Sequence, residues 1–126
     1  MSLVHGSDLS ERVIGLAIDV HRQLGPGLLE AVYEECLCFE LSRAGIQFDR
    51  QATFPVVYKD VRLECGYRID IAVEDTLIVE VKSTERILPV HEAQVLTYLR
   101  LTGRRIGLLM NFNTALLKDG LRRFVV

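Results

Sequence analysis

The chain has 126 residues, of which 49% are hydrophobic and 25% charged, and its formal net charge is −2. These values are typical of a single globular domain, here residues 1–126, that buries a core without disulfides or structural metals. They exclude a general attraction to nucleic acid through net charge, and no apolar run approaches the ~20 residues of a membrane span. Three cysteines, an odd number, argue against a disulfide framework, and no signal-peptide pattern is present, so we expect a cytoplasmic protein.

Two amphipathic helices are predicted in the first third of the chain. Residues 8–23 carry apolar side chains at helical spacing, and Gly25-Pro26-Gly27 ends this helix. A second helix is expected over residues 28–44, with Gly45 as its C-terminal cap. The predicted buried face of the second helix consists of Leu29, Val32, Tyr33, Cys36, Leu37, Leu41 and Ala44.

Strands are expected after the second helix, because the apolar period changes near Gln51. Residues 53–58 predict one strand, Lys59-Asp60 a turn, and residues 61–73 a second strand with a bulge at Gly66. A third strand, residues 76–82, follows a turn at Glu74 and Asp75.

The last third of the chain predicts a helix and two strands. The helix covers residues 91–102, between Pro89 and Gly103, and Ile106–Asn111 is an apolar strand. Leu121–Val126 predicts a final strand or a helix turn. Helix, helix, three strands, helix and two strands in this order indicate an α/β (α+β) domain with a mixed sheet.

Three ionisable residues interrupt the apolar strands in the middle of the chain. Strand alternation places Glu80 and Lys82 on one face, and a hairpin between the two strands would bring Asp70 beside them. Two carboxylates and an ammonium at one point are suited to a divalent metal and a phosphate. A solvated strand face with weak cross-strand ion pairs explains the same pattern.

Further polar residues share helix faces with one another or begin a helix. Glu30 lies on the first turn of the second helix, and Gln94 and Tyr98 lie four residues apart on the third. Tyr33 is expected in the core with its hydroxyl satisfied, and Glu34 on the helix surface.

Taken together, the motifs resemble the GxxExxY family of the PD-(D/E)XK nuclease superfamily over about Glu11 to Val126. The matching residues are His21, Leu24-Gly25-Pro26-Gly27, Glu30, Tyr33, Tyr58-Lys59, Arg68-Ile69-Asp70, Glu80-Val81-Lys82, His91, Gln94, Tyr98 and residues 107–112. The signature's leading proline is replaced here by Ile69. The resemblance implies a restriction-endonuclease-like fold, a mixed β-sheet flanked by helices.

The resemblance also implies residue roles. Asp70, Glu80 and the carbonyl of Val81 would bind Mg²⁺ or Mn²⁺, joined by Glu30, and Lys82 and Gln94 would complete the catalytic set. The implied activity is divalent-metal-dependent hydrolysis of nucleic-acid phosphodiester bonds.

The alternative is a non-catalytic regulatory module that binds nucleic acid or a protein partner on a nuclease scaffold. The implied partner is nucleic acid, DNA in the first place, and residues 100–126 hold six basic residues against one acidic residue. A homodimer is expected through Leu121–Val126 as a sheet edge.

Overall fold

The computed structural model describes residues 6–126 as helices and strands in the order that the sequence predicts. The elements are α1 (Gly6–Leu24), α2 (Glu30–Arg43), β1 (Phe48–Tyr58), β2 (Val61–Val73), β3 (Leu77–Lys82), α3 (Pro89–Thr102), β4 (Ile106–Asn111), the 3-10 helix η1 (Leu117–Gly120) and β5 (Leu121–Val125). None of the described helices has the length and apolar character needed to cross a bilayer.

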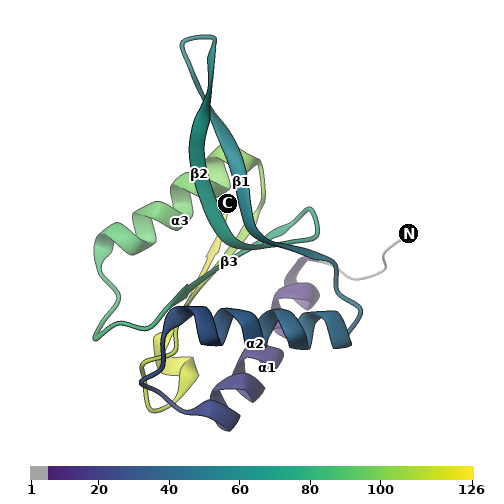
Figure 1. Ribbon diagram of the computed structural model, residues 1–126, viewed down its shortest axis with the longest axis vertical. Coiled ribbons are helices and arrows are strands. Elements are labelled where there is room, and N and C mark those ends of the chain that lie inside the picture. The colour runs from purple at the N-terminus through teal and green to yellow at the C-terminus, as the bar shows by residue number, and fades with distance from the viewer. Residues whose placement is uncertain (1–5) are drawn as a thin grey trace.

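A five-stranded mixed sheet in the order β1-β2-β3-β4-β5 forms the centre of the molecule. All neighbouring strands are antiparallel except β3 and β4, which are parallel and connected through α3. Helices α1 and α2 pack on one face and α3 on the other (Figure 1). The predicted fold class, a mixed sheet flanked by helices, is confirmed.

Strand β3 divides its side chains between the two faces of this sheet. Leu77, Val79 and Val81 are buried in the core that α1 and α2 cover, whereas Ile78 packs in the smaller core under α3. The alternation of a strand places Glu80 and Lys82 on the same side as Ile78. The predicted separation of Val81 from these two residues is therefore confirmed.

Strands β1 and β2 form a long hairpin that projects away from the rest of the molecule (Figure 1). Its turn is formed by Lys59 and Asp60, which both have positive φ, as a two-residue hairpin turn requires. A bulge interrupts the ladder, since Phe54 pairs with Tyr67 but Val56 pairs with Leu63.

The predicted position of this bulge, Gly66, has a direct structural reason. A Cβ atom on Gly66 would lie 1.6 Å from the carbonyl oxygen of Phe54. Only glycine permits the two backbones to approach this closely.

The buried face of α2 differs from the predicted one. Leu29 precedes the helix and is 76% exposed, and Val32 is 37% exposed, while Glu34 and Cys38 are buried. Tyr33, Leu37 and Leu41 are buried as predicted, and Glu34 and Cys38 lie with them on the buried face of the helix. The prediction was wrong for Leu29 and Val32, because it assigned each apolar residue near the helix start to the core.

Candidate active site

The site begins where β2 separates from β3. The ladder between these strands comprises Val73–Leu77, Ala72–Ile78 and Ile71–Val79. At the next position, side chains replace the ladder: the Asp70 backbone N–H donates to Glu80 Oε1 at 3.2 Å, and the Val81 N–H donates to Asp70 Oδ2 at 2.8 Å. Each carboxylate thus satisfies a backbone donor that the opening of the sheet would leave unpaired.

The proximity of Asp70 changes the chemistry of Glu80. Glu80 is 3% exposed, and burial together with the negative charge of Asp70 raises the pKa of Glu80 to about 9. The positive charge of Lys82 acts in the opposite direction and lowers this pKa. A buried carboxylate beside a half-buried one forms a strong attractor for a cation.

Lys82 lies at the end of β3, and the loop after it is held in place by Asn111. Lys82 pairs with Asn111 across β3 and β4, and the Phe112 N–H donates to the Lys82 carbonyl. The buried Asn111 side chain accepts from the Thr84 N–H at 3.1 Å and donates to the Thr84 carbonyl at 3.0 Å. In the described part of the chain the Lys82 side chain forms no ion pair, so its ammonium is available to a ligand.

Glu30 lies near the same loop rather than against the strand carboxylates. Its Oε2 accepts from the Ser83 N–H at 3.2 Å, and the Ser83 hydroxyl donates to the Leu28 carbonyl at 2.6 Å. The start of α2 therefore fixes the residue that directly follows Lys82. The role of Glu30 as a metal ligand stays a prediction.

Glu34, one helical turn after Glu30, connects to Asp70 through an amide. The Gln51 Nε2 donates to Glu34 Oε1 at 2.5 Å and to Asp70 Oδ1 at 3.4 Å, while Arg50 forms an ion pair with Glu34 at 3.2 Å. Burial is the main cause that raises the pKa of Glu34, with the charge of Asp70 as a further cause. The prediction that Glu34 lies on the helix surface was therefore wrong.

Helix α3 approaches the carboxylates from the other side. Gln94 Nε2 donates to the Tyr98 hydroxyl at 2.9 Å, and Tyr98 stacks on Tyr67 of β2 with a centroid distance of 5.0 Å. Burial raises the pKa of Tyr98, and the charge of Glu80 raises it further. The predicted pair of Gln94 and Tyr98 is thus present at the edge of the site.

A family model for the PD-(D/E)XK nuclease superfamily matches residues 7–124. The chain belongs to the PD-(D/E)XK nuclease superfamily. A search of curated proteins and a search of solved structures each gave no match.

We call the place where β2 separates from β3, between Asp70 and Glu80, the fork. The residues at the fork suit the divalent metal that the superfamily typically uses. Asp70, Glu80 and the Val81 carbonyl offer only oxygen atoms, which are the ligands that Mg²⁺ prefers. Within residues 6–126, no three His, Cys, Asp or Glu side chains are grouped so that they could hold a metal ion. Mg²⁺ sites commonly use one or two carboxylates and keep several waters, so two carboxylates fit this ion.

Two other motif residues of the superfamily resemblance are structural. The Tyr33 hydroxyl donates to the Gly25 carbonyl at 2.5 Å and accepts from the Leu28 N–H, which confirms its place in the core with a satisfied hydroxyl. His21 Nε2 donates to the carbonyls of Phe112 and Thr114 at 3.1 and 2.9 Å. Tyr33 therefore stabilises the turn between α1 and α2, and His21 stabilises the segment after β4.

Sequence reasoning missed Glu34, Arg50 and Gln51. A signal existed for Glu34, which lies three and four residues before the buried Leu37 and Cys38, on their helix face. No comparable signal existed for Gln51, because its contact depends on a backbone conformation rather than on spacing.

Proposed function

We propose that this protein is a divalent-metal-dependent nuclease of the GxxExxY type that hydrolyses nucleic-acid phosphodiester bonds with Mg²⁺ or Mn²⁺. The observation that carries the proposal is the direct contact of Asp70 and Glu80 at the fork, where both are linked to backbone N–H groups and Lys82 follows on the same strand. A solvated strand face does not explain this pair, since Glu80 is 3% exposed.

Each residue has a role that its position supports. Asp70, Glu80 and the Val81 carbonyl would hold the metal, which supplies charge neutralisation at the phosphate and a more acidic bound water. The Lys82 ammonium would contact the scissile phosphate or orient the attacking water. Gln94, through its hydrogen bond to Tyr98, would line the edge on which the nucleic acid lies.

The proposal extends to the setting of the reaction. We infer a single catalytic domain over residues 1–126 that acts on DNA in the first place. The cytoplasm is the expected compartment, because Cys36 and Cys38 are free thiols and a reducing compartment keeps such residues reduced.

The direct test is cleavage of a substrate panel by the wild type and by Lys82→Ala. The panel contains single-stranded, duplex and branched DNA and an RNA, each incubated with Mn²⁺ or with EDTA. We expect Mn²⁺-dependent cleavage that EDTA abolishes and that Lys82→Ala lowers by about 10²-fold or more.

The matched control is Arg12→Ala, which removes an exposed positive charge on α1 beside Ala44, whereas Glu30 at the opposite end of α2 contacts the residue after Lys82. This variant should cleave at the wild-type rate. Equal cleavage by wild type and Lys82→Ala would assign the activity to a contaminant or to another site.

A non-catalytic binding module is the second candidate, and one observation favours it. Both Asp70 and Glu80 already accept backbone N–H groups, so they contribute to the fold without any metal. Such a module would bind nucleic acid with a steep dependence on salt and would cleave no member of the panel with Mn²⁺.

A further inference from the structure

Gln51 has a backbone conformation that its place in a strand does not predict. Its φ is +54°, in the left-handed region that side chains other than glycine, asparagine and aspartate rarely adopt. The ladder between β1 and β2 omits this residue, since Arg50 pairs with Ile71 and Ala52 pairs with Ile69. The register is the same on both sides of Gln51, so no extra residue is inserted here. Residues held in sparsely populated backbone regions cluster at active sites.

The consequence of this conformation is visible in the contacts of the side chain. The Gln51 amide lies between two carboxylates and donates to both, at 2.5 Å to Glu34 and at 3.4 Å to Asp70. Glu34 in turn is paired with Arg50 and is buried on α2. The amide therefore connects Asp70, on the strand that opens, to a helix that is fixed in the core.

Asp70 is consequently held at both of its carboxylate oxygens. Its Oδ2 accepts from the Val81 N–H at 2.8 Å, and its Oδ1 accepts from Gln51. Each oxygen retains a lone pair for a further partner. With both bonds in place, the Asp70 carboxylate cannot rotate freely about its last bond.

We propose that Gln51 is a positioning residue, which orients the Asp70 carboxylate for the metal and anchors it to α2 through Glu34. The inference rests on the proposed function, because it assumes that Asp70 binds a divalent ion. Donors that orient metal ligands commonly change metal affinity by about 10- to 100-fold.

The test measures Mn²⁺ affinity of the full chain by titration calorimetry for the wild type and for Gln51→Gly. Glycine accepts a positive φ without strain, so this variant removes the amide and leaves the backbone conformation accessible. We expect Mn²⁺ to bind Gln51→Gly about tenfold or more weakly, with an unfolding midpoint close to that of the wild type. Equal or tighter binding by the variant would overturn the proposal.

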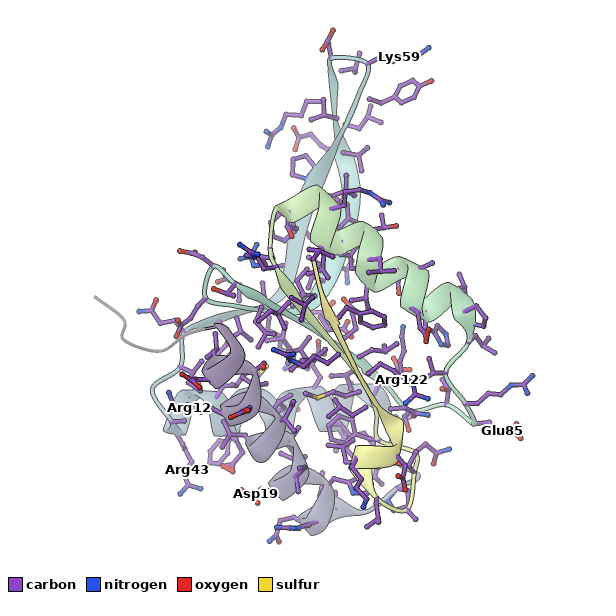
Figure 2. The ribbon with its side chains drawn as sticks, turned by 180° about the vertical axis from the view of Figure 1, so that it is seen from behind. Arg12, Asp19, Arg43, Lys59, Glu85 and Arg122 are labelled. Carbon is purple, nitrogen blue, oxygen red and sulfur yellow. The ribbon has the colours of Figure 1, made fainter. Side chains whose placement is uncertain are left out.

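Lys59→Gly is the matched control. Lys59 also has a positive φ, +47°, on the same hairpin, but it is exposed at the turn, with its ammonium 5.5 Å from the centre of the Tyr58 ring. Figure 2 shows this residue at the far end of the hairpin. The control relieves the same kind of backbone strain and should bind Mn²⁺ as the wild type does.

A measurement on the wild type keeps the proposal testable if Gln51→Gly folds poorly. The side-chain amide signals of Gln51 in a ¹H–¹⁵N spectrum should shift on titration with Mg²⁺ and saturate together with the backbone signals of Asp70 and Val81. An unchanged Gln51 amide while those backbone signals shift overturns the positioning role alone. A wild type that binds neither Mn²⁺ nor Mg²⁺ overturns the proposed function as well.

Discussion

At the scale of single residues, the contact of Asp70 with Glu80 has opposite effects on stability and on function. Burial of Glu80 and the like charge of Asp70 both oppose its ionisation, and the metal-free protein responds by keeping a proton on Glu80, whose pKa is raised to about 9. A cation bound between the two carboxylates would replace this proton. Residues that are kept in such an unfavourable place are typical of functional sites.

The raised pKa of Glu80 predicts how the stability of the metal-free protein depends on pH. The native state holds more protons than the unfolded chain between the ordinary value of 4.5 and about 9, so the free energy of unfolding falls as pH rises through this range. The slope from one group is at most about 1.4 kcal/mol per pH unit. Urea unfolding in EDTA at several pH values measures it.

The variant Glu80→Gln separates this effect from all other titrations. It keeps an oxygen acceptor for the Asp70 N–H but does not titrate, so its unfolding free energy should fall less between these pH values and exceed that of the wild type near pH 8. Glu35→Gln, on the exposed side of α2, should follow the wild type. If wild type and Glu80→Gln run in parallel, Glu80 is charged throughout the range.

At the scale of elements, local sequence signals identified two kinds of element. One kind is bounded by proline or glycine, and the other is a strand that is buried on both faces. Helix α3 begins at Pro89, two residues before its predicted start, Gly103 ends it with φ +73°, and β4 has the predicted bounds Ile106–Asn111. Strand β1 begins earlier than predicted, at Phe48. The three residues after Phe48 are polar, and this segment forms a strand because residues 48–50 pair with residues 71–73 of β2.

The site shows the same division between local and non-local information. Asp70, Glu80 and Lys82 could be predicted, because each interrupts an apolar strand at a position that alternation defines. The link from Gln51 to Glu34 could not, since it joins residues 17 positions apart through a left-handed backbone conformation. A left-handed conformation is usually indicated in a sequence by glycine, and this position carries glutamine.

The bulge of the hairpin gives a prediction about glycine. Gly66→Ala should lower the free energy of unfolding by about 2 kcal/mol or more, since its Cβ would lie 1.6 Å from the Phe54 carbonyl oxygen. Gly15→Ala is the opposite case, because nothing lies within 4 Å of its Cβ on helix α1. This second variant should raise the free energy of unfolding by about 0.5–1 kcal/mol, and urea unfolding measures both. Equal effects would mean that the backbone of the bulge moves freely.

At the scale of the whole molecule, the expected homodimer depends on the edges of the sheet. Among residues 6–126, strand β5 pairs with β4 alone and forms an edge of the sheet, and its residue Val125 is 58% exposed. We predict a dimer at micromolar concentration and a monomer for Val125→Lys, as judged by sedimentation velocity. A charged residue on an edge strand opposes pairing with a second copy. A dimer that persists in this variant would place the interface elsewhere.

The hairpin of β1 and β2 has a practical consequence for work on this protein. Its base carries Gln51 and Asp70, whereas the bulge at Gly66 separates that base from the projecting turn at Lys59 and Asp60 (Figures 1 and 2). A fluorophore or a short tag placed in this turn would extend into solvent, where loop tips tolerate insertions. The hairpin is thus a ready attachment point for immobilising or labelling the protein while the ends of its chain stay unmodified.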